Sequence, residues 1–262
     1  MEQTLRTFVL FIGYGRSGHS LVGSLLDAHK NAVVAHELRA VDLILAGESF
    51  DSLCQKIIEN SEYYAAAKTG RFQSEGGKAF SSDSYLYAVP GGYQGCHEQL
   101  QVIGDKSGGW TTRMLERKPK LLRKILNRSR LPVKWIHVVR NPYDMLATST
   151  KRAKLKSVPM GKVKTFGARC RVNEGLIQSV GEESVHTFKH ENLIENPELE
   201  LTRLCDFLEL TASDDFVEAC SSIVYKKPHR SRKEVKWSAG VKKKLQKFIN
   251  RFGFLSGYSF EG

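Results

Sequence analysis

The sequence predicts a three-layer α/β fold, with a central parallel sheet, a phosphate-binding loop (P-loop) and helices on both faces. Continuous β-prone apolar runs recur along the chain, as expected for strands that are buried on both faces of a parallel sheet. Helical patterns lie between these runs, and the alternation of strands and helices is typical of this architecture. Such folds bind their ligands at the carboxyl ends of the strands, so the functional residues are expected there.

Five segments have the composition of strands, and a helix follows the first of them. The apolar run at residues 7–13 ends at a glycine, and from Ser17 to about His29 the apolar residues are spaced as one face of a helix. The stretch 70–95 is rich in glycine, serine and tyrosine, which predicts either a lid or acceptor-side loop or a plain surface connection. The expected strands are residues 7–13, 32–35, 101–103, 133–139 and 184–189.

Size and composition are those of an ordinary globular protein. The chain has 262 residues, of which 41% are hydrophobic and 26% charged, so we expect one domain over residues 1–262. Forty Lys and Arg residues against 28 Asp and Glu residues give a formal charge of +12. This charge favours anionic partners such as phosphates, sulfates, acidic polysaccharide, nucleic acid or a membrane surface, and it does not distinguish among them.

The cysteines and the N-terminal segment bear on location. The five cysteines form no CxxC pair and have no metal-ligand spacing to histidine, so a reducing cytosol fits best and a cytoplasmic protein is expected. The apolar run at residues 8–12 is too short for a signal sequence or a membrane span, which predicts no stable membrane insertion. The cysteines are Cys54, Cys96, Cys170, Cys205 and Cys220.

A glycine-rich loop follows the first expected strand. It reads Gly13-Tyr-Gly-Arg-Ser-Gly-His-Ser20, with the glycine spacing of a P-loop, but His19 stands where the nucleotide-binding lysine would be and a cation comes earlier as Arg16. Glycines let backbone N–H groups turn inward, and the helix that follows adds its positive end, so the loop suits a phosphate. The residues expected to hold a 5′-phosphosulfate are Gly15, Arg16, Ser17, Gly18, His19 and Ser20.

This loop resembles the 5′-phosphosulfate loop of the sulfotransferases that use 3′-phosphoadenosine 5′-phosphosulfate (PAPS), which reads much like Gly-x-x-Arg-Ser-Gly-Thr-Thr-Leu. His19 and Ser20 stand in place of the two threonines. The likeness is greatest to the tyrosylprotein branch, whose loop helix continues into Leu-Asp-Ala-His and then a glutamate, as in Leu26-Asp-Ala-His29 and Glu37. The resemblance therefore implies that Glu37 is the catalytic base.

A second motif follows the strand expected at residues 133–139. The sequence Arg140-Asn-Pro-Tyr-Asp144 leads into a helix with its proline in the first turn, where a missing N–H does no harm, so Arg140 projects from a strand end. The segment resembles the 3′-phosphate motif of the same family, Arg-Asn-Pro-x-Asp followed by a serine. This implies that Arg140 binds the 3′-phosphate together with Thr148 or Ser149. The alternative for Arg140 is an ion pair with Asp144.

The C-terminal half holds further likenesses to the family. His190 lies in a segment that resembles a strand-to-helix segment of the family, where it replaces a tyrosine near the nucleotide; a packed histidine is the alternative. The basic stretch at residues 228–237 resembles the loop that closes over the nucleotide, and a solvated basic loop is its alternative. The nucleotide-binding candidates in that stretch are Ser231, Arg232 and Lys236.

Sulfuryl transfer needs an in-line nucleophile, a base for its proton, and positive charge where oxygens gain negative charge. Glu37 is the expected base, provided that burial raises its pKa toward neutrality. His36 is the rival base, because its ordinary pKa is already suitable, but successive strand residues face opposite ways and only one of the two is expected to point into the cleft. The alternative for Glu37 is a salt bridge with Arg39 or a charge at the start of a helix.

Two cations are candidates for stabilising the developing charge. Arg16 is one. Lys106 is the other, because the segment Gly104-Asp-Lys-Ser107 resembles an Asp-Lys-Thr segment of the family, although Gly108 replaces its proline. For Lys106 the alternative is a surface lysine ahead of a helix.

The resemblance implies PAPS as cosubstrate, release of 3′-phosphoadenosine 5′-phosphate (PAP), and no metal. The acceptor would be a hydroxyl or amine of a small molecule, glycan or peptide. Two other classes stay open: a P-loop nucleotide kinase, whose lysine is missing here, and a noncatalytic binder of sulfated glycan or nucleic acid, suggested by the charge of +12. Nucleic acid is not an expected partner, because the motifs predict two separated phosphate sites rather than base-stacking aromatics or long basic stripes.

Overall fold

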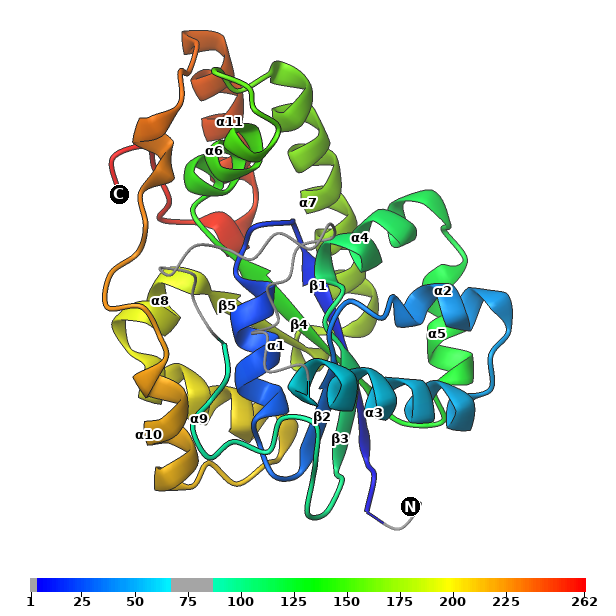
Figure 1. Ribbon diagram of the computed structural model, residues 1–262. Coiled ribbons are helices and arrows are strands. Elements are labelled where there is room, and N and C mark those ends of the chain that lie inside the picture. Colours follow the sequence, from blue (N-terminus) through cyan, green and yellow to red (C-terminus); the bar gives the residue numbers. More distant parts are fainter. Residues whose placement is uncertain (1–3, 67–86) are drawn as a thin grey trace.

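The computed structural model describes residues 4–66 and 87–262, and its centre is a parallel β-sheet (Figure 1). Within these residues the sheet has five strands in the order β2-β3-β1-β4-β5. All neighbouring strands pair in parallel, which confirms the predicted fold class. The strands are β1 (Thr7–Gly13), β2 (Ala32–Ala35), β3 (Val102–Asp105), β4 (Val133–Val139) and β5 (Val185–Lys189).

Strand β3 continues two residues beyond its predicted end. Gly104 and Asp105 pair with Val9 and Leu10 of β1. A side chain at Gly104 would place its Cβ only 2.4 Å from the Val9 carbonyl oxygen, so the close approach of the two strands requires glycine there. The extension matters for the site, because it carries Lys106 to the carboxyl edge of the sheet.

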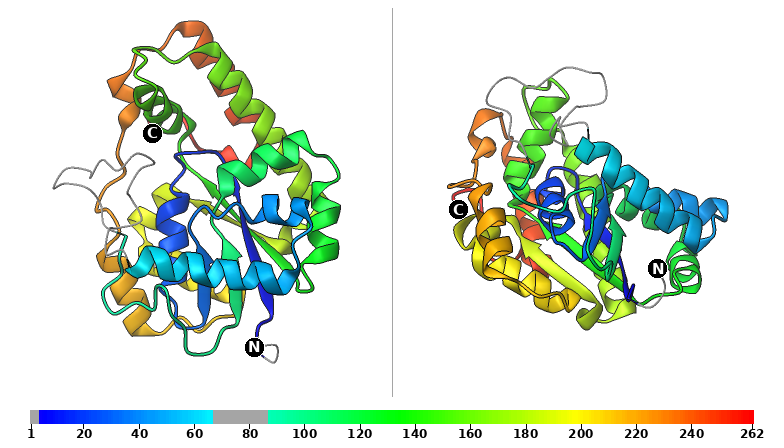
Figure 2. Two further views of the ribbon diagram at one scale, coloured as in Figure 1. Left: turned by 45° about the vertical axis from the view of Figure 1, so that its right-hand side comes forward. Right: turned by 60° about the horizontal axis from the view of Figure 1, so that its bottom comes forward.

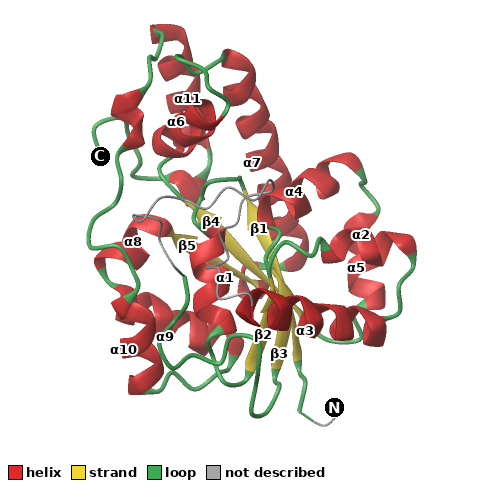
Figure 3. Ribbon diagram, viewed as in Figure 1, coloured by secondary structure: helices red, strands yellow, loops and turns green. Residues whose placement is uncertain are grey.

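Helices cover both faces of the sheet, as its apolar strands require (Figure 3). Alternate residues of β1 face opposite layers: Val9 and Phe11 belong to one hydrophobic cluster, and Phe8, Leu10 and Ile12 to the other. The first layer holds α1 (His19–Asp27), α8 (His190–Glu195), α9 (Pro197–Leu208) and α10 (Asp214–Ser222). The second layer holds α2 (Ala40–Ala46), α3 (Phe50–Ala66), α4 (Gly108–Arg117), α5 (Leu121–Arg128) and the last turns of α7 (Met160–Val180).

A third hydrophobic cluster lies beyond the carboxyl ends of β1 and β4, above the sheet in Figure 1. It joins the first half of α7 to α6 (Pro142–Arg152), α11 (Ala239–Arg251) and the short 3₁₀ helix η3 (Gly253–Leu255). A second 3₁₀ helix, η2 (Ser231–Glu234), packs on α6 and links this cluster to α10 along one edge of the molecule (Figure 2). The remaining 3₁₀ helix is η1 (Glu182–Ser184).

The strand order places the topological switch point between β1 and β4. From β1 the chain crosses to β2 and β3 on one side, and then returns to β4 and β5 on the other. Open parallel sheets bind their ligands at this point, outside the carboxyl ends of the strands. Of the stretch predicted as an irregular excursion, residues 70–86 lie outside the described residues, and residues 87–95 form turns.

No helix in the described ranges 4–66 and 87–262 is both long and apolar enough to cross a membrane.

Candidate active site

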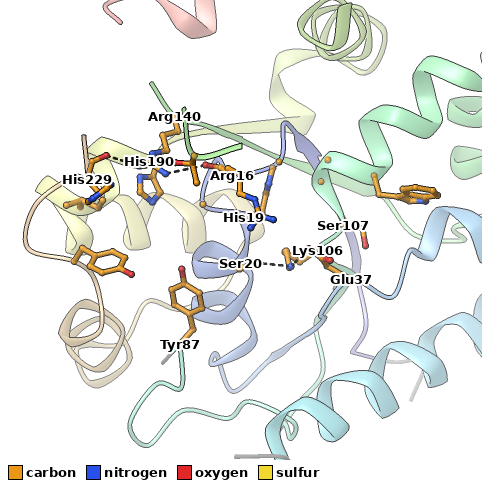
Figure 4. A pocket seen from close by; sticks show the side chains of 18 of the residues that line it. Arg16, His19, Ser20, Glu37, Tyr87, Lys106, Ser107, Arg140, His190 and His229 are labelled. Atoms are coloured by element: carbon orange, nitrogen blue, oxygen red, sulfur yellow. Dashed lines mark hydrogen bonds and ion pairs between the residues drawn. The ribbon is translucent and has the colours of Figure 1, made fainter. Parts of the chain in front are cut away.

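The carboxyl ends of all the strands meet at one cavity of about 550 Å³. Every strand contributes a lining residue just beyond its end: Glu37 after β2, Lys106 after β3, Arg140 after β4 and His190 at the end of β5, together with the loop that follows β1. In Figure 4, Arg140, His190 and His229 lie at one end of the cavity, and Glu37, Lys106 and Ser107 lie at the other. The cavity is therefore elongated, with the phosphate loop between its two ends.

The loop between β1 and α1 has the geometry of an anion-binding turn. Gly15, Arg16, Gly18 and Ser20 line the cavity, as the sequence predicted. Gly18 has a left-handed backbone with a φ of 101°, and a Cβ there would lie 2.2 Å from the imidazole Cδ2 of His190. The N–H groups of Leu21 and Val22 donate to the Gly18 carbonyl oxygen, at 3.0 and 3.3 Å, whereas those of His19 and Ser20 precede any partner carbonyl of the helix and can serve an anion in the cavity.

His19 shapes this loop without contributing charge. Its Nε2 lies 3.0 Å from the Ile12 carbonyl oxygen, and its ring fills the space beside Gly13 and Gly108, where a Cβ would lie 2.7 and 2.5 Å from that nitrogen. Burial lowers the pKa of His19 to about 4, so the imidazole is neutral at pH 7. His19 lines the cavity as predicted, but as a neutral packed ring.

The hydroxyl of Ser17 does not face the cavity. Its Oγ donates to the Tyr14 carbonyl oxygen at 2.6 Å and the residue is buried. A contact from Ser17 to an anion in the cavity would have to use its backbone N–H.

Glu37 and Lys106 lie together at the end of the cavity opposite Arg140. The Lys106 ammonium donates to Glu37 Oε1 at 3.1 Å and to Ser20 Oγ at 3.2 Å. Lys106 is only 2% exposed, because its stem crosses α1 at Gly23, where a Cβ would lie 2.6 Å from its Cγ. The alternative of a surface lysine is therefore wrong.

Two expectations for Glu37 are also wrong. Its ion-pair partner is Lys106 rather than Arg39. Its side chain is 66% exposed, so the burial on which its role as base depends is missing in this structure. A substrate that covered this end of the cavity would supply that burial.

A buried carboxylate fixes the turn that carries Glu37. Glu37 and Arg39 both have left-handed backbones, with φ of 56° and 61°, which is unusual for residues other than glycine. The carboxylate of Asp105 accepts hydrogen bonds from the N–H groups of Leu38 at 3.1 Å and Ala40 at 2.8 Å. Burial raises the pKa of Asp105 to about 6. Asp105 therefore holds the turn in the conformation that directs Glu37 at the cavity.

His36, the rival base, is turned away. Its ring packs on Tyr64, with the ring centroids 4.8 Å apart, and it does not line the cavity. As expected, only Glu37 of this pair lines the cavity, although both residues lie in the turn after β2 rather than in the strand.

Arg140 and Thr148 form the other end of the cavity. Arg140 donates to the carbonyl oxygens of His229 at 2.8 Å and Arg16 at 3.4 Å, so it links the phosphate loop to the C-terminal segment. Thr148 lines the cavity, and its hydroxyl donates to the Asp144 carbonyl oxygen at 2.8 Å and lies 2.8 Å from Ser231 Oγ.

Ser149, the predicted substitute for Thr148, lies elsewhere. Its Oγ accepts a hydrogen bond from Lys162 at 2.8 Å, and it does not line the cavity. Of the two predicted partners of Arg140, only Thr148 is in place.

Asp144 pairs with Arg232 and not with Arg140. The Arg232 guanidinium donates to both oxygens of Asp144, at 3.0 and 2.6 Å, and also to the carbonyl oxygens of Ser259 and Phe260. The side chains of Arg232 and Asp144 are only 5% and 2% exposed. The predicted role of Arg232 in nucleotide binding is not supported, because its donors are satisfied inside the protein.

The other two candidates of the basic stretch also miss the cavity. The hydroxyl of the buried Ser231 donates to the Asp144 carbonyl oxygen at 2.9 Å. The main chain of Lys236 bonds to Lys156 and Val158, which fixes this segment beside the end of α6. Neither Ser231 nor Lys236 lines the cavity.

His190 does line the cavity, next to Gly18. Burial, helped by the charge of Arg140, lowers its pKa to about 3, so the ring is neutral. Its Nδ1 has no hydrogen-bond partner in the part of the chain that the structure describes. The alternative of a packed histidine therefore agrees with the structure, and the residue also lines the cavity.

Several lining residues were not predicted. Arg39 lies two residues after Glu37, and Trp110 lies in the first turn of the helix after Lys106, so both could have been found by following each strand end a few residues further. The residues concerned are Arg39, Tyr87, Ser107, Trp110, Ile194, Tyr225 and His229, with Gly108 and Gly109.

Residues 4–66 and 87–262 contain no group of three or more histidine, cysteine, aspartate or glutamate side chains that could hold a metal ion.

Comparison with known proteins identifies the family. The sulfotransferase domain model matches residues 6–253. The sulfotransferase domain of the olefin synthase from Synechococcus PCC 7002 has a similar structure, with a TM-score of 0.54, 14% identity and 96% of each chain covered. The sulfotransferase domain from the curacin biosynthetic pathway is similar too, with a TM-score of 0.52, 13% identity, and 96% of this chain and 98% of that one covered.

A third similar structure is sulfotransferase STF9 from Mycobacterium avium, with a TM-score of 0.52, 9% identity, and 95% of this chain and 77% of that one covered. At these identities the structures establish the fold alone, and no curated protein sequence matched the chain. The family match extends over almost the whole sequence. The chain therefore belongs to the sulfotransferase family of PAPS-dependent enzymes.

Proposed function

We propose that the cavity binds PAPS along its length and transfers the sulfuryl group to an acceptor placed at Glu37. The observation that carries this proposal is that the glycine-rich loop after β1 and Arg140 after the adjacent β4 line one cavity, with Glu37 and Lys106 at the far side of the loop. A nucleotide with phosphates at both its 3′ and 5′ positions matches two separated sites of this kind.

The residues at the Arg140 end would hold the 3′-phosphoadenosine part. Arg140 offers a planar fork of donors and Thr148 a hydroxyl, which together suit a phosphate approached from two sides. Tyr87 and Tyr225 line this cavity and offer ring faces to a purine. The neutral His190 adds a hydrogen-bonding ring beside the loop.

The loop would hold the 5′-phosphosulfate. Backbone N–H groups from Gly15 to Ser20 and the N-terminus of α1 favour an anion at this position. Arg16 adds a cation, and Lys106 reaches the loop through its contact with Ser20.

Glu37 would take the proton of the acceptor. The acceptor oxygen or nitrogen forms a bond to sulfur, the bond between sulfur and the bridging oxygen breaks, and the electron pair stays on the 5′-phosphate of the departing PAP. Lys106 and Arg16 stabilise the charge that develops on that oxygen. Because Lys106 contacts both Ser20 and Glu37, it can also hold the base in line with the sulfur.

Transfer of radiolabel from [³⁵S]PAPS to a panel of hydroxyl and amine acceptors (small molecules, glycans and peptides) tests this proposal. With an accepted compound, Glu37→Gln should lower kcat about 100-fold or more while the affinity for PAP stays unchanged, since general-base catalysis contributes about 10²–10⁴-fold. His36→Gln is the matched control and should keep kcat. A large loss of kcat in His36→Gln with little loss in Glu37→Gln would reverse the assignment of the base. If ATP with Mg²⁺, and not PAP, stabilised the protein against unfolding, the kinase alternative would be favoured.

A further inference from the structure

The proposed PAPS complex does not use every cation that lines the cavity. Among the lining residues that the structure describes, the arginines and lysines are Arg16, Arg39, Lys106 and Arg140, and the only carboxylate is Glu37. In the proposed complex Arg140 serves the 3′-phosphate, and Arg16 and Lys106 serve the phosphosulfate. Arg39 remains without a role in binding the nucleotide.

Arg39 is held in place by neutral groups. Its guanidinium lies over the Trp110 ring, 4.4 Å from the centroid, and its backbone N–H donates to Ser107 Oγ at 3.1 Å. Trp110 is itself fixed, because its Nε1 donates to Asp42 at 2.9 Å. No carboxylate in residues 4–66 and 87–262 lies within ion-pair distance of Arg39. A stacked guanidinium keeps the N–H donors at its edge, which can bind a carboxylate or a similar anion.

Arg39 lies beside the expected position of the acceptor. It follows Glu37 by two residues on the same left-handed turn, and both side chains line the same cavity. An acceptor whose hydroxyl reaches Glu37 therefore has its neighbouring atoms close to Arg39 and Trp110.

We propose that the acceptor carries an anionic group, bound by Arg39 on its Trp110 platform, close to the hydroxyl or amine that receives the sulfuryl group. The inference rests on the proposed function and specifies the acceptor side of the same site. The chemistry is that of a carboxylate, or of a sulfate or phosphate ester, next to a flat apolar surface. Arg39 is then a specificity residue that distinguishes charged acceptors from uncharged ones of the same shape.

Matched pairs of acceptors test this directly. One pair is 4-hydroxyphenylacetate with 4-hydroxyphenylacetamide, a second is glucuronate with its methyl ester, and a third is a tyrosyl peptide flanked by glutamate with the same peptide flanked by glutamine. For the wild type, kcat/KM should be higher for the charged member of an accepted pair. Arg39→Gln should lower kcat/KM for the charged member about 10- to 100-fold and leave the neutral member nearly unchanged, as expected for one charge-assisted hydrogen-bonded pair.

Arg113→Gln is the matched control. Arg113 also lies over the Trp110 ring, at 5.3 Å, but it does not line the cavity, so its loss should leave the preference for charged acceptors unchanged. The preference of the wild type should also weaken as NaCl is raised, since Arg39 is exposed to solvent.

The outcomes separate the two proposals. Equal or better transfer to the neutral members, or an equal effect of Arg39→Gln and Arg113→Gln, would overturn the inference and leave the sulfotransferase proposal in place. If PAP binds but no member of any pair accepts sulfate, the inference also fails. If PAP does not bind, the proposed function itself fails.

Discussion

The side chains that line the cavity differ from the polar side chains buried directly behind it. Arg140 lines the cavity and, among the described residues, donates to two carbonyl oxygens, whereas Arg232 is enclosed by the Asp144 carboxylate and two carbonyl groups. At the other end, Glu37 is two-thirds exposed while Asp105 is fully buried and accepts two backbone hydrogen bonds. The comparison teaches that an ionisable group near the site is available to a ligand only where the protein has not already satisfied it.

Consequently, substitutions in the lining should change binding or catalysis with little effect on folding, and substitutions in the buried layer should change stability first. The predictions below test this separation.

The largest stability effect is expected for Arg232→Met. Removing the guanidinium leaves the Asp144 carboxylate buried without its partner, which typically costs about 3–5 kcal/mol. Urea denaturation should show this loss in the free energy of unfolding. Arg140→Met, the matched change in the lining, should stay within ~0.5 kcal/mol of the wild type.

A double variant makes this prediction robust if Arg232→Met folds poorly. Replacing both members, as Asp144→Leu with Arg232→Met, removes the unpaired charge and should recover most of the lost stability. If Arg140→Met and Arg232→Met were equally destabilising, the distinction between the two layers would be wrong.

Stability should fall as the pH is lowered below about 6.5. Burial lowers the pKa of His19 to about 4 and the pKa values of His137 and His190 to about 3, from an ordinary value of 6.5. Below pH 6.5 the unfolded chain binds protons that the folded chain does not. Each of these histidines therefore lowers the free energy of unfolding by ~1.4 kcal/mol per pH unit once it is protonated in the unfolded chain. Burial raises the pKa of Asp105 from 3.8 to about 6, so this group acts in the opposite direction between pH 6 and 4.

Denaturation at a series of pH values from 7 to 5 would measure the net effect. His137→Gln should reduce the slope of the free energy of unfolding against pH by the contribution of about one proton, ~1.4 kcal/mol per pH unit. Asp105→Asn should increase this slope by about the same amount. A pH dependence that neither substitution changes would contradict the assignment of these buried groups.

The smallest effect separates Thr148 from Ser149. Thr148→Ala should weaken PAP binding by up to about tenfold, the contribution of one hydrogen bond, because its hydroxyl lines the cavity. Ser149→Ala should change the dissociation constant less than twofold, because its hydroxyl accepts from Lys162 outside the cavity. Titration calorimetry with PAP compares the two, and a larger loss in Ser149→Ala would mean that the ligand-bound helix differs from this structure.

The sheet was predictable from the sequence because its signals are local. Each strand is a short apolar run, and the runs at β1, β2 and β4 agree with the structure at both ends. The residues just after the strands were predictable for the same reason, since parallel strands bring their carboxyl ends to one edge. Glu37, Lys106, Arg140 and His190 all follow this rule.

The fate of individual charges was not predictable, because it depends on residues distant in sequence. Lys106 is buried only because Gly23 of α1 leaves room for its stem. Arg232 is unavailable because Asp144 lies 2.6 Å away after the chain has folded back from η2 onto α6. In the sequence, Arg232 is one cation of a basic stretch, and nothing there indicates that Asp144 will enclose it.

The most direct test of the central claim is the thermal shift produced by PAP and by 5′-AMP, which lacks the 3′-phosphate, on the wild type and on Arg140→Ala. A ligand that binds only the folded state raises Tm, and the shift grows with the ratio of its free concentration to its Kd. At equal concentrations PAP should therefore stabilise the wild type more than 5′-AMP does. In Arg140→Ala the two nucleotides should give nearly the same small shift. If PAP were no better than 5′-AMP for the wild type, or kept its full advantage in Arg140→Ala, the 3′-phosphate would not bind at Arg140 and the account of the cavity would be wrong.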